Sequence, residues 1–327
     1  MKVMYNGISI ILCTYNGSKT IAESLSHINA IKFQYPFELI IVDNASTDDT
    51  LKLVHSILTT SKLNWKIVAE PNPGLSHARW KGILNAKYDI ILFCDDDNYL
   101  AHDYLEVGFE IFVSNSRVGI LGGKGVASLD GDKPYWFDSF SHSYAVGSIG
   151  KTDGVQKRMS YHYGAACFFL RSALLHLNKI GFVSVLTDRK GEMLSSGGDV
   201  ELCYAVQLLN YDLCYSSNLH FKHFIEKSRL NRDYYLRLKK GITSSFPLLT
   251  AYEFFNIKST FQYKKYLFKV FFESTIVLFF IFLRKVFFMQ RKDDDIDFVI
   301  YKTRFVSFLQ NYKMAVKHFL FIRATIS

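Results

Sequence analysis

Short apolar runs alternate with amphipathic helical patterns over the first hundred residues of this 327-residue chain, and this alternation limits the possible folds most strongly. Four runs have the length and apolar content of buried strands: residues 8–13, 37–42, 65–70 and 88–94. Between them, apolar residues recur at intervals of three and four, as on one face of a helix. The alternation predicts βαβ units and a mostly parallel sheet flanked by helices, which is an α/β fold.

Polar residues follow each of the four predicted strands. They are Thr14, Tyr15 and Asn16 after the first, Asp43 and Asn44 after the second, residues 70–72 after the third, and Asp95, Asp96 and Asp97 after the fourth. Because ligands of open parallel sheets bind beyond the carboxyl ends of the strands, these residues predict one shared site. Three adjacent carboxylates repel one another, and a bound Mg²⁺ or Mn²⁺ would offset that repulsion, since these ions prefer oxygen ligands. A solvated acidic turn that caps the next helix is the alternative.

Charge divides the chain into two unlike parts. From residue 222 to the end there are 20 lysines and arginines against 8 acidic residues, whereas the part before residue 222 has a net charge of −3. We therefore predict a first domain over residues 1–224 and a basic, aromatic-rich helical region over residues 225–327. The basic region suits an anionic membrane surface. It contains no recognised nucleic-acid-binding motif, so no nucleic acid partner is expected.

The five cysteines form no CxxC pair, and their odd number does not suit a disulfide framework. Two of them, Cys13 and Cys94, lie in apolar runs, where cysteine behaves as a small hydrophobic residue. This usage is typical of a reducing cytosol. The apolar run near the N-terminus is too short for the core of a signal peptide, so we expect a cytoplasmic location.

Four segments of the first hundred residues resemble the signature segments of family 2 glycosyltransferases in order and spacing: SIILCTYNGSKTI, ELIIVDNASTDDT, PNPGLSHAR and DIILFCDDDN. Two later segments resemble the acceptor-side and catalytic segments of the same family: YHYGAACFFLRSAL and SSGGDVELCYAVQLLNYDLCYSSNLHFKHF. The resemblance covers about residues 7–224. It implies the GT-A fold, a Rossmann-like α/β architecture, to which the C-terminal helical region is an extension.

The resemblance implies an enzyme of the bacterial cell-surface polysaccharide type. Such an enzyme is a metal-dependent inverting transferase. It would move a sugar from a nucleotide-diphosphate sugar, with a UDP-sugar favoured, to a hydroxyl of a glycan or lipid-linked acceptor. A catalytically silent nucleotide-sugar-binding or scaffold protein at the membrane is the alternative.

The family's donor-binding residues correspond here to Thr14, Tyr15, Asn16, Asp43, Asp48, Arg79, Asp95 and Asp96. Among them, Asp43 matches the residue that hydrogen-bonds the base, and Arg79 matches a basic residue near the diphosphate. Three of these residues also have a purely structural alternative. It is an Asx-turn for Asp43, a helix N-cap for Asp48 and a surface position on a helix for Arg79.

The metal ligands implied by the resemblance are Asp97, Asp95 and His223, with Mn²⁺ or Mg²⁺ as the ion. Asp97 matches the last aspartate of the family's DxD motif, the direct ligand, and Asp95 matches the first. Asp96 occupies the variable position and is expected to be an exposed spectator. His223 lies in a strand-like segment, where packing is the alternative to ligation. Without nucleotide sugar and metal, we expect the three carboxylates to be hydrated and mobile.

Asp199 corresponds to the family's catalytic base, which takes the proton of the acceptor hydroxyl. The family commonly has a Glu-Asp pair here, whereas this chain has Gly198 before Asp199. Glu201 competes for the role, but two residues apart on a helix are separated by about 200°, so both are not expected to face one reacting centre. A helix cap with Ser196 as the N-cap is the structural alternative for Asp199. Glu201 and Trp136 are also candidates for acceptor contact, and core packing suits Trp136 equally well.

The segment 269–292 is apolar and aromatic, but its longest uncharged run, 274–283, has only 10 residues. A membrane-spanning helix needs about 20. We therefore predict an interfacial amphipathic helix whose basic flanks contact anionic headgroups, with a core helix or a true span as alternatives. Membrane contact through residues 265–292 would hold the protein on the inner face of the cell membrane.

Overall fold

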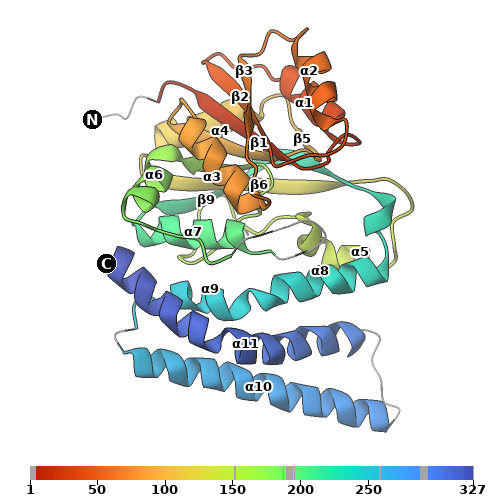
Figure 1. Cartoon of the computed structure of the whole chain (residues 1–327), viewed down its shortest axis with the longest axis vertical. Coiled ribbons are helices and arrows are strands. Elements are labelled where there is room, and N and C mark those ends of the chain that lie inside the picture. Colours follow the sequence, from red (N-terminus) through yellow and green to blue (C-terminus); the bar gives the residue numbers. More distant parts are fainter. Residues whose placement is uncertain are drawn as a thin grey trace.

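The computed structural model describes residues 5–150, 152–186, 188, 194, 196–257, 259–287 and 294–326. Its strands are β1 (Ile8–Thr14), β2 (Phe37–Asp43), β3 (Trp65–Ala69), β4 (Ile90–Asp95), β5 (Asn98–Leu100), β6 (Val118–Leu129), β7 (Gly154–Val155), β8 (Cys167–Leu170) and β9 (Asp212–Ile225). Its helices are α1 (Ile21–Asn29), α2 (Thr50–Leu58), α3 (Leu75–Asn85), α4 (Tyr104–Ser114), α5 (Phe137–Phe140), α6 (Arg171–Lys179), α7 (Gly198–Leu208), α8 (Arg232–Ser244), α9 (Phe246–Glu253), α10 (Thr260–Val286) and α11 (Asp294–Ile326), with short 3₁₀ helices η1 (Ser141–Tyr144) and η2 (Lys227–Arg229). Figure 1 shows the sheet and its covering helices in one half of the molecule and α8 to α11 in the other.

Within the described residues, nine strands form one mixed sheet in the order β3-β2-β1-β4-β8-β6-β9-β5, with β7 paired to β9. The first four strands are parallel, and their registers place Thr14 beside Asp43 and Cys13 beside Asp95. The strand β8 is antiparallel to both β4 and β6. The polar ends of β1, β2 and β4 therefore meet at one edge of the sheet, and the predicted α/β fold is confirmed.

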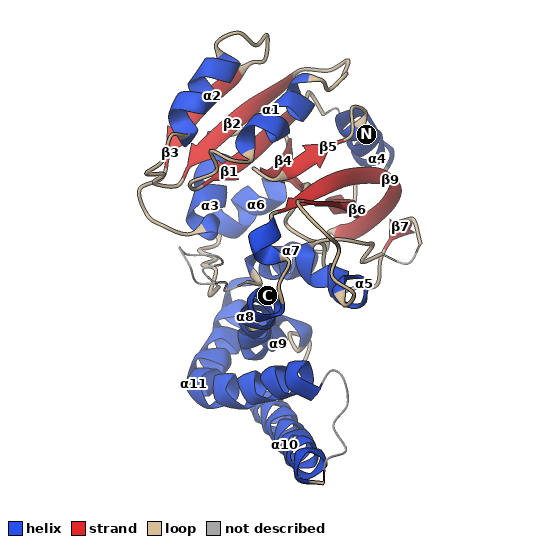
Figure 2. Ribbon diagram, turned by 90° about the vertical axis from the view of Figure 1, so that its right-hand side faces the viewer, coloured by secondary structure: helices blue, strands red, loops and turns tan. Residues whose placement is uncertain are grey.

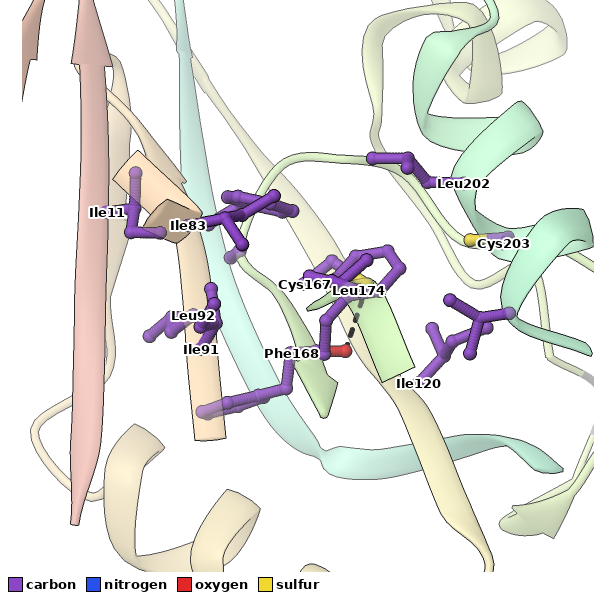
Figure 3. Packing of buried hydrophobic residues seen from close by; sticks show 14 of the residues in the cluster. Ile11, Ile83, Ile91, Leu92, Ile120, Cys167, Phe168, Leu174, Leu202 and Cys203 are labelled. Carbon is purple, nitrogen blue, oxygen red and sulfur yellow. Dashed lines mark hydrogen bonds between the residues drawn. The ribbon is translucent and has the colours of Figure 1, made fainter. Parts of the chain in front are cut away.

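Every residue of β1 is buried, as is every residue of β2 except the first. Continuous apolar burial of this kind is typical of parallel strands with helices on both faces. The helix α3 approaches β1 closely at Gly82, where a Cβ would lie 2.3 Å from Ile11 Cγ2. Figure 3 shows Ile11, Ile83 and Ile91 in this core.

The sequence pattern does not predict β5 or β6. The strand β5 has only three residues and directly follows the acidic triplet. The strand β6 contains glycines that interrupt its apolar pattern, and it pairs with β9. At Gly123, a Cβ would lie 2.0 Å from the carbonyl oxygen of Leu219, so this approach of the two backbones requires glycine.

The sheet ends with β9, and the described elements after it are helices. These helices do not build a separate core, because Tyr252 on α9, Tyr263 on α10 and Phe319 on α11 belong to the same buried cluster as the sheet. The rings of Tyr263 and Phe319 stack with their centroids 4.3 Å apart. Figure 2 shows α8 and α9 below α7, between the sheet and α10, which lies farthest from the sheet. The division proposed near residue 224 thus marks a change from strands to helices within continuous packing.

One helix in the described part of the chain, α10, is long and apolar enough to cross a membrane, and 17% of its most apolar stretch is buried. Its buried residues, Tyr263, Leu267, Ser274 and Ile281, lie on the face that packs against the molecule. The opposite face carries exposed aromatic and aliphatic side chains. The 10-residue uncharged run in the sequence therefore underestimates the apolar surface of this helix.

Candidate active site

A cavity of about 1480 Å³ opens at the polar edge of the sheet. Its walls come from the ends of β1 and β4, from α3 and α7, from β9, and from the C-terminal helices α8, α9 and α11. The site residues predicted from the sequence that line it are Thr14, Tyr15, Arg79, Asp95, Asp96, Asp97, Asp199 and His223. Five others, all in the described part of the chain, do not line it: Asn16, Asp43, Asp48, Trp136 and Glu201.

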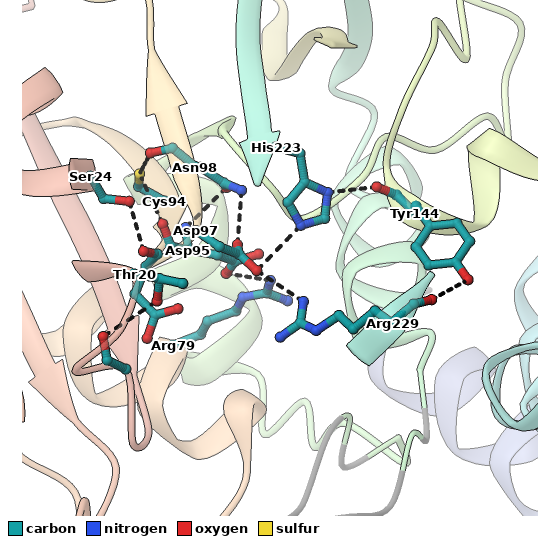
Figure 4. Close-up of polar contacts among 12 residues, drawn as sticks. Thr20, Ser24, Arg79, Cys94, Asp95, Asp97, Asn98, Tyr144, His223 and Arg229 are labelled. Carbon is teal, nitrogen blue, oxygen red and sulfur yellow. Dashed lines mark hydrogen bonds and ion pairs between the residues drawn. The ribbon is translucent and has the colours of Figure 1, made fainter. Parts of the chain in front are cut away.

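Asp97 lies at the centre of the polar contacts in this cavity (Figure 4). Its Oδ2 is 3.3 Å from His223 Nε2 and 3.1 Å from Arg229 Nη1. Its Oδ1 accepts a hydrogen bond from Asn98 Nδ2 at 3.1 Å. His223 reaches Asp97 because β5 and β9 pair antiparallel with Asn98 opposite His223. Sheet pairing thus brings a histidine and a carboxylate that are far apart in the sequence into direct contact.

The expected hydrated and mobile triplet is wrong for Asp97, which is only 7% exposed. Arg229 and His223 offset its charge from within the protein. Burial lowers the pKa of His223, but the Asp97 carboxylate and a hydrogen bond to the Tyr144 carbonyl outweigh it, so the net shift is upward. Arg229 cannot be recognised from the sequence, because its contact with Asp97 depends on the path of the chain after β9.

Asp96 is not the exposed spectator that the sequence suggests. It is half-buried, and Thr14 Oγ1 donates a hydrogen bond to its Oδ2 at 2.5 Å. A Cβ at Gly17 would lie 2.1 Å from the same oxygen, so the loop after β1 folds tightly over this carboxyl group. Burial, and then the neighbouring Asp97 carboxylate, raise the pKa of Asp96 to about 7. Asp96 therefore joins the first loop to the acidic triplet.

Arg79 is 4% exposed, so the alternative of a surface arginine is wrong. Its Nη2 lies 3.8 Å from Asp95 Oδ1 and its Nη1 lies 3.4 Å from Asp188 Oδ2. The guanidinium also lies over the ring of Phe93, 5.3 Å from the ring centroid. A buried cation held between two carboxylates faces the cavity from the start of α3.

Asp199 lies in the first turn of α7 and faces the cavity. Its Oδ2 accepts a hydrogen bond from the Gly164 N–H at 2.8 Å, and its Oδ1 accepts one from the Val200 N–H at 2.8 Å. These two bonds fix the orientation of the carboxylate. The N-cap of α7 is Gly197, without a side-chain cap, so the helix-cap alternative with Ser196 is wrong.

Asp188 is a site residue that the sequence does not reveal. Its Oδ1 accepts a hydrogen bond from the Gly198 N–H at 2.6 Å. A Cβ at Gly198 would lie 2.3 Å from Asp188 Oδ2, so the carboxyl group occupies the space of a side chain at position 198. Burial, and then the Asp199 carboxylate, raise the pKa of Asp188 to about 7. A carboxylate from another loop therefore fills the place where the resemblance leads one to expect a glutamate.

Gly198→Ala should push the Asp188 carboxyl group away from Arg79 and lower glycosyl transfer by about tenfold or more, because small displacements in a site reduce the rate strongly. The measurement compares the transfer rates of Gly198→Ala, Asp188→Ala and the double variant that combines them. In the Asp188→Ala background, Gly198→Ala should add little further loss, because the clash is gone. An equal loss in both backgrounds would contradict the contact between these two residues.

Glu201 is fully buried and faces away from the cavity. The N–H groups of Val185 and Leu186 donate to its carboxylate at 3.0 and 3.1 Å, and the Tyr252 hydroxyl donates to it at 2.7 Å. His318 Nε2 lies 3.5 Å from Glu201 Oε1. These partners connect α7 to α9 and α11. The prediction of acceptor contact by Glu201 is therefore wrong, and its role is structural.

Trp136 is also buried, within an aromatic cluster beside η1 and α8. Its ring centroid lies 5.4 Å from that of Tyr235 and 6.5 Å from that of Phe137. This packing leaves no indole face directed into the cavity. The core-packing alternative holds for Trp136, and the predicted acceptor contact is wrong.

Asp43 and Asn16 organise the loops at the edge of the cavity. Asp43 Oδ1 accepts a hydrogen bond from the Ser46 N–H at 3.2 Å. Asn16 Oδ1 accepts one from the Thr47 N–H at 2.8 Å, and the Asn16 N–H donates to Ser46 Oγ at 3.1 Å. The loops after β1 and β2 are thereby held together. Any contact of these two residues with a nucleotide remains a prediction from the resemblance.

Asp48 has local partners as well. Its carboxylate accepts hydrogen bonds from the N–H groups of Ser18 at 3.3 Å and Thr50 at 3.0 Å, and from the Thr50 hydroxyl. Burial raises the pKa of Asp48, but the hydrogen bonds from Thr50 and Ser18 together outweigh it and lower the pKa to about 2. Asp48 therefore joins the start of α2 to the loop after β1, but the N-cap of α2 is Asp49, so the N-cap alternative for Asp48 is wrong.

The three predicted metal ligands do not come together as a set. Among the residues that the structure describes, no group of three or more His, Cys, Asp or Glu is arranged to hold a metal ion. Asp97 and His223 meet, whereas Asp95 lies beside Arg79. The Nδ1 of His223 is hydrogen-bonded to the Tyr144 carbonyl at 2.6 Å, which directs Nε2 towards Asp97, as for a metal-binding imidazole. This pair fits an Mn²⁺ or Mg²⁺ ion whose coordination is completed by substrate phosphates.

The family model described as Glycosyl transferase family 2 matches residues 9–177, more than half of the chain. The chain belongs to this family. As a family 2 member it is a glycosyltransferase, and the predicted enzyme class is confirmed. The matched part ends before α7 and β9, so the roles of Asp199, His223 and Arg229 depend on the geometry of the cavity.

Curated relatives of this family 2 chain include synthases of a polysaccharide. The poly-beta-1,6-N-acetyl-D-glucosamine synthase of Staphylococcus aureus is 25% identical over 173 residues, which are 52% of this chain and 40% of the synthase. The synthase of the same name from Staphylococcus epidermidis is 23% identical over 214 residues, which are 64% of this chain and 48% of the synthase. The match thus spans less than half the length of these relatives.

Solved structures show the same fold over most of the chain. TarS 1-349 of S. aureus is 18% identical with a TM-score of 0.53, and the match covers 94% of this chain and 91% of TarS 1-349. A mannosyltransferase from Pyrobaculum calidifontis, in complex with GDP-Man and Mn²⁺, is 16% identical with a TM-score of 0.57 and coverage of 95% and 88%. At this level of identity the likeness shows the fold, and the predicted GT-A architecture is confirmed.

Proposed function

We propose that this family 2 glycosyltransferase moves a sugar from a nucleotide-diphosphate sugar, with a UDP-sugar favoured, to a hydroxyl of a glycan or lipid-linked acceptor in bacterial polysaccharide synthesis. Transfer would need a divalent metal and proceed with inversion. The observation that carries the proposal is one cavity that contains both the Asp97–His223 pair and Asp199. Similar proteins with UDP-GlcNAc, or with GDP-Man and Mn²⁺, support this donor class.

The donor half of the cavity combines carboxylates with cations. Asp97 and His223 would hold the metal after Arg229, now 3.1 Å from Asp97, turns towards the diphosphate. The bound metal would supply Lewis-acid stabilisation of the leaving diphosphate. Arg79 and Arg229 would add charge-assisted hydrogen bonds to the phosphate oxygens. Tyr15 is 49% exposed on the cavity wall, where its ring is free to lie against the base.

The acceptor half of the cavity is built around Asp199. Its carboxylate would take the proton from the acceptor hydroxyl, while that oxygen forms a bond to the anomeric carbon. The bond between the anomeric carbon and the diphosphate oxygen breaks at the same time, and the electron pair leaves with the nucleoside diphosphate. Attack from the side opposite the leaving group inverts the configuration. The N–H groups of Gly164 and Val200 keep the base oriented during this step.

The proposal is tested by incubating the purified chain with UDP-, GDP-, dTDP- and CMP-sugars, each with Mn²⁺ and with EDTA, and quantifying released nucleotide by chromatography. We expect metal-dependent release from one donor class, by slow hydrolysis alone and faster with a glycan acceptor. A catalytically silent binding protein would be stabilised by a donor in a thermal melt but would release no nucleotide. That result, over the whole panel, would refute the enzymatic proposal.

We propose that α10 contacts the inner surface of the cell membrane. Phe272 is 67% exposed, Ile276 43% and Phe279 57%, and their spacing of four and three puts them on one face of the helix. Basic residues stand before and after these residues in the sequence, with Lys269 on the N-terminal side and Lys285 on the C-terminal side. Aromatic side chains with basic flanks are typical of an interfacial helix on anionic headgroups.

Phe272→Ser combined with Phe279→Ser should lower binding to vesicles of phosphatidylglycerol and phosphatidylcholine by about tenfold or more, because two exposed aromatic side chains are lost from the contact. Vesicle flotation measures the bound fraction. Leu84→Ser on α3, where the native side chain is 53% exposed, is the matched control and should bind as the native chain does. Unchanged flotation of the double variant would exclude this contact.

A further inference from the structure

The cavity continues beyond Asp199 between the C-terminal helices. The residues that line this part have no role in the proposed donor binding or in proton transfer to Asp199. Lys239 on α8 and Arg304 on α11 face this part of it. Leu238, Ile242, Leu249 and Ile300 surround them with apolar side chains. Two half-buried cations among these apolar side chains need an explanation, because burying charge without a partner is unfavourable.

Arg304 is held by aromatic rings, and the described part of the chain offers no carboxylate to its charge. Its guanidinium lies over the ring of Phe246, 4.8 Å from the centroid, and near that of Tyr301, at 5.4 Å. Its Nε is buried and has no hydrogen-bond partner. Among the described residues, no carboxylate lies within 4.0 Å of Arg304 or Lys239. The buried Nε–H of Arg304 is therefore satisfied neither by solvent nor by a described carboxylate.

The environment of Lys239, like that of Arg304, is poor in negative charge. Burial, and then the neighbouring Arg304, lower the pKa of Lys239. Glu253 also lines the cavity, but its carboxylate accepts from the Tyr204 hydroxyl at 3.5 Å instead of pairing with either cation. The two cations are thus close enough to repel each other, and a bound anion would relieve both the repulsion and the unpaired donors.

The pair lies next to the base. Ser245, at the junction of α8 and α9, packs against Gly197, where a Cβ would lie 2.9 Å from Ser245 Oγ. Gly197 precedes Asp199 by two residues, and Phe246 follows Ser245 and carries the Arg304 contact. The cationic pair is therefore on the acceptor side of the cavity, and Asp97 with Arg229 is on the donor side.

We propose that Lys239 and Arg304 form a subsite for a phosphate or diphosphate ester of the acceptor, beside the hydroxyl that receives the sugar. This inference deepens the proposed function and rests on it. The planar guanidinium, held against the rings of Phe246 and Tyr301, suits two-point binding of phosphate oxygens, and the ammonium supplies a second charge. The apolar side chains around the pair suit the carbon chain of a lipid that carries the phosphate.

The test is calorimetric titration of the full chain with farnesyl diphosphate in EDTA, which keeps the metal-dependent donor site from loading. Lys239→Gln combined with Arg304→Gln should bind about tenfold more weakly or worse, because two charge-assisted contacts are lost. The matched control is Lys240→Gln combined with Lys302→Gln. It removes the same charge from exposed positions of the same helices and should bind within about twofold of the native chain. Thermal melts establish that each variant is folded.

Two further probes identify the source of the phosphate. One outcome is that inorganic pyrophosphate loses the same affinity in the double variant and binds the native chain as tightly as farnesyl diphosphate does. In that case the subsite recognises the phosphate groups alone. If farnesyl diphosphate binds the native chain more tightly, the ester is carried by a lipid. Equal affinity of native chain and double variant for both probes would overturn the subsite, and so would binding of farnesol as tight as that of farnesyl diphosphate.

The failure of the subsite and the failure of the proposed function give different results. Suppose that the native chain releases nucleotide from a donor, and that the double substitution leaves the affinity for farnesyl diphosphate unchanged. That result supports the proposed function and refutes the subsite. A native chain that binds farnesyl diphosphate through these two residues, but releases no nucleotide from any donor, keeps the anion site and loses the glycosyltransferase proposal.

Discussion

Asp97→Asn is expected to lower glycosyl transfer at least about 100-fold in the presence of Mn²⁺, because a metal contributes several kcal/mol to stabilising the leaving group. Asp97 lines the cavity and contacts both His223 and Arg229. An amide at this position binds a divalent cation weakly and leaves the two basic side chains without a counter-charge. The measurement is the initial rate of nucleotide release and of sugar transfer with the donor that the native chain accepts.

Stability needs a separate measurement in this variant. Removing one partner of a buried ion pair typically destabilises a protein, so a lower melting temperature of Asp97→Asn is expected. Rates should be compared well below that temperature. Asp212→Asn is the control: it removes an ion pair with Arg117, at 3.1 Å, from the opposite end of β9. A rate for Asp97→Asn within about twofold of the native rate would mean that this carboxylate does not hold the metal.

Asp199→Asn should lower transfer by about 100- to 10,000-fold, the usual contribution of a positioned general base. The side chain would keep its place, because the amide oxygen still accepts one of the two N–H bonds that orient the carboxylate. Donor binding, measured by titration with Mn²⁺ present, should stay close to that of the native chain, since Asp199 does not contact the Asp97 cluster in the structure. A large loss of rate without loss of donor affinity is the signature of a base.

Glu201→Gln is the informative comparison for this prediction. Glu201 lies two residues after Asp199 and is fully buried. Its carboxylate accepts hydrogen bonds from the N–H groups of Val185 and Leu186 and from the Tyr252 hydroxyl. Glu201→Gln should lower the melting temperature clearly, whereas the catalytic rate measured on folded protein should change little. The opposite pattern, with full transfer by Asp199→Asn and none by a well-folded Glu201→Gln, would move the base to Glu201.

The sequence predicts the first half of the fold well, for a physical reason. Strands such as Ile8–Thr14 and Phe37–Asp43 are continuous apolar runs because helices cover both faces of the sheet, and such runs are recognisable without neighbours. Their polar ends then indicate a site at the carboxyl edge. In contrast, the apolar pattern of Val118–Leu129 is interrupted by glycines, so the sequence gives little sign of the strand that pairs with β9 there.

The cavity shows where prediction from sequence stops. Asp97 and Asp199 stand in recognisable segments, whereas Arg229 and Asp188 come from segments without any pattern, and only folding brings them to Asp97 and Gly198. Trp136 shows the converse error. A large aromatic side chain in a polar region suggests a sugar-binding face, but its environment is a buried aromatic cluster with Tyr235. Burial, which decides between these roles, is a property of the tertiary structure.

The proposed donor site is tested most directly by titrating the native chain with the nucleoside diphosphate that turnover releases, UDP first, in Mn²⁺ and in EDTA. In the proposed metal site, the described residues Asp97 and His223 would supply the protein ligands, so nucleotide and metal are expected to bind together. The predicted result is an affinity at least about tenfold higher with Mn²⁺ than with EDTA. Equal affinity in the two buffers would contradict the metal site at Asp97 and His223.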